Sequence, residues 1–324
     1  MFDVVALGEV LIDFTPNGRS ENGNLLFERN PGGAPANVLA AVAKLGLKTA
    51  FIGKVGNDQF GLFLVNVLKD IDINTEGLVF SNDVNTTLAF VHLNEQGDRS
   101  FSFYRNSGAD MMLEEDEVNK NIIRNAKIFH FGSVSMTHEP ARTATIQAAS
   151  LAKESNVIVS YDPNLRPALW NSLPEAKETI LNCMKYADIL KISEEELLFL
   201  TGSKDMDTGT QYLYDKYNTK LILVTLGPNG CFFRKGESTG HSQTYDVKTI
   251  DTTGAGDAFL GGALYQILQR NKGLEDFTAA DIYQCIDFAN AVGSLAITKK
   301  GAIPAMPTLK EVEACTGQVN KLSL

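Results

Sequence analysis

Apolar residues along the chain alternate between short uninterrupted runs and longer segments in which they recur every three or four positions. A short run is typical of a buried strand, and the longer spacing is typical of a helix that packs one face against a core. The expected strands are 4–7, 49–53, 128–131, 157–161, 189–192, 221–225 and 231–234. The expected helices are 35–45, 58–71, 141–154, 174–186, 194–200, 259–267 and 279–298. Strands that alternate with helices predict an α/β protein whose mostly parallel central sheet carries helices on both faces.

One region departs from this rhythm. Residues 87–93 and 99–105 form a predicted β-hairpin, with 95–98 as its glycine-containing turn. The alternation of apolar and polar residues in this hairpin is typical of a sheet that has one face in water. We therefore expect a small β-sheet that stands off the main body. Residues 10–14 are expected to join it, and the turn formers at 16–18 to close that strand.

The segment 251–259 combines the features of a phosphate site. Gly254 and Gly256 flank Ala255, Asp257 follows at once, and a helical pattern begins there. Glycines expose backbone N–H groups, and the first turn of a helix adds unpaired donors and the positive end of the helix dipole. Asp257 would then lie where a substrate hydroxyl meets the phosphate. An ordinary junction between a loop and an acidic helix start explains the same residues, so the context has to decide.

A second glycine-rich segment, 32–37, precedes an early helix. Gly32 and Gly33 allow the backbone to approach a small polar ligand closely. Asn37 can both donate and accept hydrogen bonds, which suits a sugar hydroxyl. Simple capping of the helix is the alternative explanation. Asp13 is a lone carboxylate in an apolar strand, so it either pairs with a structural partner or faces a ligand.

Polar residues also follow three of the predicted strands, at the sheet edge where ligands of α/β proteins bind. Asn164 and Arg166 follow the strand 157–161, and Arg166 either clamps a sugar or phosphate oxygen or forms a surface ion pair. The acidic run 193–196 either stabilises a helix N-terminus or holds Mg²⁺ through water. The turn 226–230 either admits a nucleotide beside its glycines or is a turn alone.

Composition excludes several classes of function. The 324 residues are 44% hydrophobic, enough for one large or two medium domains. The formal charge of −10 disfavours nucleic-acid or anionic-membrane partners, which attract basic faces. Neither the four cysteines nor the four histidines show metal-ligand spacing, and the chain contains no P-loop, dinucleotide-binding or nucleophile-elbow motif. No signal-like start or apolar run of about 20 residues appears, so we expect a cytoplasmic protein without a membrane span.

These motifs together resemble one family. Residues 32–37 with Leu45-Gly46 look like the N-terminal signature of ribokinase-type (PfkB) sugar kinases, and residues 251–257 look like their C-terminal signature. The order and separation of the two signatures fit the family over essentially the whole chain. Four further segments look most like those of fructokinases, with 2-keto-3-deoxygluconate kinases as near neighbours: 103–106, 161–166, 198–202 and 301–305.

The resemblance implies an ATP-dependent kinase of the ribokinase-like fold. Asp257 would act as the general base on a sugar hydroxyl, C6–OH for fructose, and the amides of Gly254, Ala255 and Gly256 would stabilise the transferring phosphoryl group. The residues implied to hold the sugar are Asp13, Gly33, Asn37, Arg105, Asn164 and Arg166. Those implied to line the nucleotide site are Ser193, Thr225, Gly227, Gly230, Gly256 and Asn290.

The resemblance also implies two cations and a movable part. Glu196 matches the acid of the family's Asn-x-x-Glu motif and would hold Mg²⁺ through water, although Ser193 replaces the asparagine. The residues that match a K⁺ site beside the phosphate, mostly through their carbonyl groups, are Asp251, Thr253, Ala296, Lys299 and Gly301. Residues 1–324 would form a single kinase domain, in which segments 10–30 and 86–106 make a lid that often pairs in dimers.

Two alternatives stay open at this point. The first is a kinase of the same family for 2-keto-3-deoxygluconate or for another sugar. An acid substrate would need basic groups in its pocket, and Arg105 and Arg166 are available. A non-catalytic protein that senses sugar or nucleotide would share the scaffold. The intact Asp257 and its glycine loop argue against a sensor, because binding alone requires no general base.

Overall fold

The computed structural model describes residues 1–93 and 99–322. Within these residues, nine strands form a central sheet in the order β13-β12-β11-β10-β9-β8-β1-β4-β5. The pairs from β5 across to β11 are parallel, whereas β12 and β13 add an antiparallel edge. The strands of this sheet are β1 (Phe2–Leu7), β4 (Thr49–Gly56), β5 (Ile73–Ser81), β8 (Ala126–Phe131), β9 (Ile158–Tyr161), β10 (Ile189–Ser193), β11 (Leu221–Thr225), β12 (Cys231–Lys235) and β13 (Ser238–Ser242).

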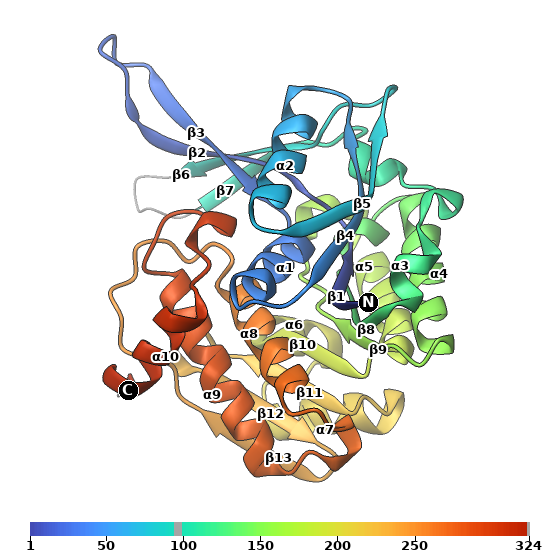
Figure 1. Ribbon diagram of the computed structural model, residues 1–324, viewed down its shortest axis with the longest axis vertical. Coiled ribbons are helices and arrows are strands. Elements are labelled where there is room, and N and C mark those ends of the chain that lie inside the picture. The colour runs from blue at the N-terminus through green and yellow to red at the C-terminus, as the bar shows by residue number, and fades with distance from the viewer. Residues whose placement is uncertain (94–98, 323–324) are drawn as a thin grey trace.

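Helices cover both faces of the central sheet (Figure 1). Alternate residues of a buried strand point to opposite faces, so Val4 packs in one hydrophobic core and Val5 in the other. The first core includes α1 (Ala34–Lys44), α2 (Gln59–Asp70), α8 (Ala255–Gln269), α9 (Ala279–Ala296) and α10 (Leu309–Gln318). The second includes α3 (Lys120–Arg124), α4 (Ala141–Glu154), α5 (Leu173–Cys183), α6 (Glu194–Thr201) and α7 (Met206–Tyr217).

A separate four-stranded sheet stands off this body (Figure 1). Its order is β3-β2-β6-β7, and the pairing of β2 with β6 is parallel while the outer pairs are antiparallel. The strands are β2 (Leu11–Arg19), β3 (Leu25–Gly32), β6 (Leu88–Leu93) and β7 (Arg99–Tyr104). The expected turn at 95–98 lies outside the described residues.

Several local expectations needed correction. The strand that begins near residue 10 does not close at 16–18. It continues to Arg19 with an irregular register after Pro16, because β6 pairs only with Ile12–Phe14 and the outer part of β2 pairs with β3 alone. Strands β3, β5 and β13 and helices α3, α7 and α10 were not predicted. They are short or mixed in polarity, so their apolar spacing was weak.

Helix α8 lies unusually close to its two helical neighbours because it carries two consecutive glycines. A Cβ atom on Gly261 would lie 2.5 Å from the Cβ atom of Ala41 on α1, and one on Gly262 would lie 2.8 Å from a methyl group of Val292 on α9. The close contact with α1 brings the first turn of α8 beside the first turn of α1. The two glycine-rich segments of the sequence therefore meet, although about 220 residues separate them.

Within the described residues, no helix is long and apolar enough to cross a membrane.

Candidate active site

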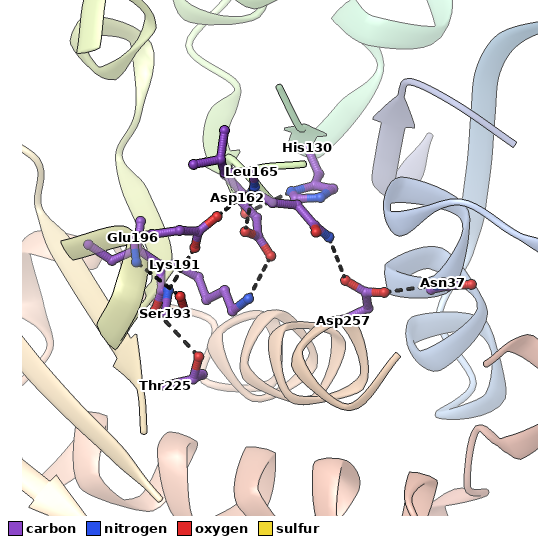
Figure 2. A network of polar contacts seen from close by, with 12 residues as sticks. Asn37, His130, Asp162, Leu165, Lys191, Ser193, Glu196, Thr225 and Asp257 are labelled. Carbon is purple, nitrogen blue, oxygen red and sulfur yellow. Dashed lines mark hydrogen bonds and ion pairs between the residues drawn. The ribbon is translucent and has the colours of Figure 1, made fainter. Parts of the chain in front are cut away.

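The site begins with a row of polar side chains on the α8 face of the central sheet. On this face the strands present Ile128, Ile189 and Leu223 to the first core, and toward their carboxyl ends the same alternation presents polar residues instead. These polar residues are His130 on β8, Ser160 and Asp162 at the end of β9, Lys191 on β10 and Thr225 on β11. The row lies at the edge of the sheet where the first turn of α8 arrives (Figure 2).

Asp257 is fixed in the first turn of α8 by two amide side chains. Its side chain is buried, with only 7% of the residue exposed. Asn37 on α1 donates to Oδ2 at 2.8 Å, and Asn164 after β9 donates to Oδ1 at 3.3 Å (Figure 2). Burial raises the pKa of Asp257, the neighbouring Asp162 raises it further, and Lys191 acts in the opposite direction. The two bonds orient the carboxylate and leave each oxygen able to accept a further hydrogen bond.

Lys191 and Asp162 form a buried ion pair beside Asp257. The Nζ atom of Lys191 lies 2.9 Å from Oδ2 of Asp162, and both residues are almost inaccessible to water. Burial alone would lower the pKa of Lys191, but the carboxylates of Asp162, Glu196 and Asp257 outweigh burial and raise it. Lys191 therefore carries its positive charge. His130 is also buried and has a pKa lowered by burial to about 4, so it is neutral at physiological pH.

Glu196 closes the far end of this row and caps helix α6. Its Oε2 accepts from the Ser193 N–H at 2.7 Å, and the Ser193 hydroxyl accepts in return from the Glu196 N–H at 3.1 Å, which is a capping box. Its Oε1 accepts from the Leu165 N–H at 2.7 Å, so it also holds the loop after β9 (Figure 2). Both oxygens keep a free lone pair. Ser193, which was expected beside the nucleotide, is used as a helix cap.

The N-terminus of α8 supplies the backbone donors. Gly254 precedes the helix in a left-handed conformation, with φ of 75°, and a side chain there would collide with Ala302. The N–H of Ala255 donates to the Thr252 carbonyl at 3.3 Å, so that amide has a partner in this conformation. The first-turn amides of Gly256 and Asp257 point along the helix axis, where a phosphate group would meet them.

A cavity of about 400 Å³ opens on the side of α8 that faces β11. Of the residues expected to line a nucleotide site, the structure places Thr225, Gly227, Gly230, Gly256 and Asn290 on its wall. Asn290 is buried and donates to the carbonyl oxygens of Ser242 and Gln243, so it braces the loop after β13. Tyr245, Val247, Phe259 and Leu322 give the wall an apolar part of the kind that suits a flat base.

A second space, of about 250 Å³, lies between the small sheet and the segments at 250–253 and 300–301. Asp13 lines it from β2, and its carboxylate has no hydrogen bond to any other residue that the structure describes. Burial raises the pKa of Asp13 to about 7, with Arg166 opposing and Asp251 adding to the effect. Arg166 lines the adjoining space together with Phe103 of β7. The Oδ1 atom of Asn37 is buried and has no partner among the described residues, so it too is available to a hydroxyl donor.

The loop that precedes α1 requires glycine at position 33 for a steric reason. Its φ of 116° is accessible mainly to glycine, and a Cβ atom there would lie 2.3 Å from the Glu9 carbonyl oxygen. Oε1 of Glu9 accepts from the Ala34 N–H at 3.0 Å, which anchors the loop to the end of β1.

Arg105 was expected in the sugar site, but the structure places it in a buried ion pair at the exit from β7. Its guanidinium donates to Asp110, to the Thr137 hydroxyl and to the Val134 carbonyl. The pair with Asp110 measures 2.8 Å and both side chains are nearly inaccessible. A guanidinium held by three partners is committed to the fold, so we do not count Arg105 among the sugar-binding groups.

The five residues expected around a monovalent cation come from two loops that the structure joins. Oδ1 of Asp251 accepts from the N–H and hydroxyl of Thr253, and Oδ2 accepts from the Gly301 N–H at 3.0 Å. The Lys299 N–H donates to the Ala296 carbonyl at 3.4 Å at the end of α9. Segments 251–253 and 296–301 are therefore neighbours, and they flank the loop that leads into α8.

Reasoning from the sequence missed several residues of this site, among them Asp162, Lys191 and Leu322. Asp162 and Lys191 were visible as charged residues within or directly after apolar strands. Burial of a charge costs free energy unless the charge is paired, so such residues often have a functional role. Leu322 had no usable signal, because its place on the cavity wall follows from a bridge between Tyr245 and Lys321 near the end of the chain.

The described residues do not form a direct metal cage, since no group of three or more His, Cys, Asp or Glu side chains is arranged to hold an ion. They do fit a cation held through water and phosphate oxygens. Asp162, Glu196 and Asp257 place three buried carboxylates around one lysine, and carboxylate oxygens are the ligands that Mg²⁺ prefers.

Fold and site together define a phosphotransferase of the α/β class: a nucleotide-sized cavity and a polar cleft meet at a helix N-terminus that carries a carboxylate. Residues 1–309 match the pfkB family carbohydrate kinases. A probable fructokinase-2 of Arabidopsis thaliana is 47% identical over 307 residues, which are 94% of this chain and 93% of that protein. The chain belongs to the pfkB family of carbohydrate kinases.

Solved structures agree with this assignment. A fructokinase from Xylella fastidiosa with bound ATP superposes with a TM-score of 0.91 at 34% identity, covering 98% of this chain and 99% of that one. A fructokinase from Vibrio cholerae O395 with bound fructose, ADP and calcium superposes with a TM-score of 0.88 at 35% identity, covering 97% of this chain and 99% of that one. The predicted ribokinase-like α/β fold, with its mostly parallel sheet and separate small sheet, is confirmed.

Proposed function

We propose that this chain is an ATP-dependent fructokinase that converts D-fructose and ATP into D-fructose 6-phosphate and ADP. The observation that carries the proposal is the position of Asp257. It lies in the first turn of α8, where Gly256 lines the nucleotide-sized cavity and Gly254 lines the space beside Arg166 and the small sheet. The similarity to fructokinases over nearly the whole chain supports the choice of sugar.

The transfer uses one protein base. Asp257 accepts the proton of the sugar C6 hydroxyl, and the resulting oxygen forms a bond with the γ-phosphorus of ATP. The bond between that phosphorus and the β–γ bridging oxygen breaks, and ADP leaves with the electron pair. The carboxylate is held toward the hydroxyl by Asn37 and Asn164, and orientation contributes more here than basicity. Donors in the first turn of α8 stabilise the charge on the moving phosphoryl group.

The nucleotide would lie along the cavity between β11 and α9. Thr225, Gly227 and Gly230 line the end of the cavity next to β11, and Gly256 would contact the phosphates. Asn290 holds the cavity wall in place near the expected position of the nucleobase. Glu196 would hold Mg²⁺ through water, with Asp162 close by, and the metal would neutralise charge on the ATP phosphates. This arrangement does not require the asparagine that Ser193 replaces, because both oxygens of Glu196 are already oriented by backbone amides.

The loops at 251–253 and 296–301 are proposed to hold K⁺ next to the phosphate-binding turn. Carbonyl oxygens of Asp251, Thr253, Ala296, Lys299 and Gly301 are the donors assigned to it. Asp251 ties Thr253 and Gly301 together, so the carboxylate would set the spacing of the two loops. Omission of K⁺ from the assay, with Na⁺ or choline in its place, is expected to lower turnover.

The charges of the cleft favour a neutral sugar over a sugar acid. Because Arg105 is committed to Asp110, Arg166 is the arginine that lines the cleft, and it faces the carboxylate of Asp13. A carboxylate substrate would meet Asp13, Glu28 and Asp251 in the cleft, and these carboxylates outnumber the cations Arg166 and Lys300 that line it. Sugar hydroxyls can instead donate to Asp13 and to Oδ1 of Asn37.

The decisive experiment measures ADP release with fructose, ribose, tagatose, adenosine and 2-keto-3-deoxygluconate as candidate substrates. We expect fructose to give the highest kcat/KM. A higher value for 2-keto-3-deoxygluconate would establish the sugar-acid alternative. Absence of ADP release with every sugar, while nucleotide still binds, would instead favour a non-catalytic sensor.

The small sheet is proposed to act as a lid over the sugar and to pair with a second copy of the chain. Exposed apolar side chains on this sheet include Leu25, Leu26 and Tyr104. Sedimentation analysis is expected to give a dimer, and Leu25→Lys is expected to shift it toward monomer. A location in the cytoplasm and the absence of nucleic-acid and membrane partners stay predictions.

A further inference from the structure

Lys191 occupies a position that the fold alone would give to an apolar residue. It follows Ile189 on the same face of β10, and that face packs against α8 and the first hydrophobic core. Only 6% of the residue is exposed. A buried ion pair with Asp162 does not by itself stabilise a fold relative to well-packed apolar residues, because both charges lose their hydration. The contribution of Lys191 to stability therefore does not explain why a lysine occupies this position, and we looked for a functional role.

The hydrogen bonds of Lys191 are incomplete. An ammonium group has three N–H donors, and the structure gives one of them to Oδ2 of Asp162 at 2.9 Å. The other two donors have no partner among the described residues, although the group is buried. Charged donors without partners are costly, so this site is built to receive a further acceptor.

The place where that acceptor would lie is set by α8. A Cβ atom built on Gly256 would lie 2.9 Å from Nζ of Lys191, so the ammonium group touches the first turn of the helix at its second residue. The same turn carries Asp257, and Gly256 also lines the nucleotide-sized cavity. Figure 2 shows Lys191 extending toward this turn from the side opposite Asn37. The backbone N–H donors of the first turn of α8 and the ammonium group of Lys191 therefore lie close together, beside the proposed general base Asp257.

We propose that Lys191 is a catalytic residue that binds the γ-phosphoryl group of ATP through its ammonium group and stays bound to it during transfer. This proposal rests on the proposed function only in that the transferred group is a phosphoryl group. Asp162 holds the lysine toward Gly256 and shares its charge until the triphosphate arrives. The lysine adds a full positive charge to the partial charge of the helix N-terminus, and both act where negative charge develops in the transition state.

The test compares Lys191→Met and Lys191→Arg with Lys153→Met as a matched control. Lys153 also forms an ion pair, with Asp188 at 2.6 Å, but its side chain is 41% exposed and the pair lies near the opposite end of the same strands. We expect Lys191→Met to lower turnover by about 100-fold to 1000-fold, the range for loss of one transition-state donor. Lys191→Arg is expected to recover part of the loss, and Lys153→Met to keep the turnover of the wild type.

Nucleotide binding separates a catalytic role from a structural one. Calorimetry is expected to show that Lys191→Met binds the non-hydrolysable triphosphate AMP-PCP about tenfold more weakly than the wild type, or weaker still. This loss of affinity corresponds to the loss of one charge-assisted hydrogen bond. The affinity for ADP, which lacks the γ-phosphoryl group, is expected to stay within about threefold. Equal losses for both nucleotides, or turnover within about threefold of wild type, would overturn the proposal.

The binding experiment also distinguishes this proposal from the choice of sugar. If the wild type binds both nucleotides but does not phosphorylate fructose, the proposed substrate is wrong. The ratio of AMP-PCP to ADP affinity in Lys191→Met still decides the role of Lys191, because that ratio needs no sugar.

Discussion

Two carboxylates on opposite sides of the cleft, Asp257 and Asp13, differ in how completely the protein holds them. Asp257 on the body accepts hydrogen bonds from two amide side chains and lies beside a lysine. Asp13 on the small sheet has a raised pKa of about 7 and no hydrogen bond to another described residue. Burial raises the pKa of both groups, but only Asp257 is oriented before any ligand binds.

The difference corresponds to two kinds of task. A general base has to be positioned before the reaction, since each misplacement of the proton acceptor raises the barrier. A sugar-binding carboxylate receives its partners from the ligand, so its hydrogen bonds are absent until the hydroxyls arrive. The body of the molecule therefore carries the chemistry, whereas the small sheet carries recognition.

The largest effect is expected for Asp257→Asn, which removes the base and keeps the shape of the side chain. Turnover should fall by about 1000-fold or more, because proton transfer from the hydroxyl loses its acceptor. Fructose binding, measured by calorimetry, should change little. If turnover stays close to that of the wild type, Asp257 is not the base and the comparison with Asp13 loses its meaning.

A smaller effect, on recognition, is expected for Asp13→Asn. Loss of one or two hydrogen bonds to a charged acceptor should raise the KM for fructose by about 10-fold to 100-fold. The KM for ATP should stay unchanged, which serves as the internal control. A fall in kcat as large as that of Asp257→Asn would show that the small sheet takes part in the chemistry.

Asp13 should also make the stability of the protein depend on pH. Its pKa is about 7 in the folded protein against an ordinary value of 3.8, so the folded state binds more protons than the unfolded state between these values. The contribution of Asp13 to stability is therefore greatest at the low end of this window and is lost as the pH rises through about 7. Thermal melts should show Asp13→Asn raising Tm at pH 8 more than at pH 5. If Asp13→Asn changed Tm equally at pH 5 and pH 8, ionisation of Asp13 would not be the cause of the change.

The smallest effect concerns the nucleotide side. Leu322 lines the cavity, and the chain around it is held by hydrogen bonds between the backbones of Asp246 and Asn320 and of Leu322 and Thr244. Leu322→Ala removes apolar contact worth about 1 kcal/mol, so the KM for ATP should rise about fivefold. The KM for fructose should not change. A larger effect on fructose than on ATP would mean that the tail acts on the cleft and not on the nucleotide cavity.

Much of the fold followed from local pattern alone. The alternation of apolar runs and helical spacing was enough for the parallel sheet and for α2, α4 and α9, because buried strands and long amphipathic helices leave strong periodic signals. The hairpin of β6 and β7 was visible for the same reason. Strand β3 was not, because it is largely exposed and mixed in polarity, and only its pairing with β2 makes it a strand.

The candidate site likewise contains residues that the local sequence indicated and residues that only the tertiary structure brought together. Glycine spacing, with the acid that follows it, identified the first turn of α8 and the start of α1, since local backbone geometry dictates those residues. What the chain could not indicate is which charges become neighbours. Arg105 could be expected to bind a ligand until the fold paired it with Asp110. Lys191 was visible as a charge within an apolar strand, but its position beside Gly256 is known only from the packing of α8 against the sheet. Local sequence determines conformation at short range, whereas ion pairs and pockets depend on the close packing of α8 against α1 and the sheet, which joins residues far apart along the chain.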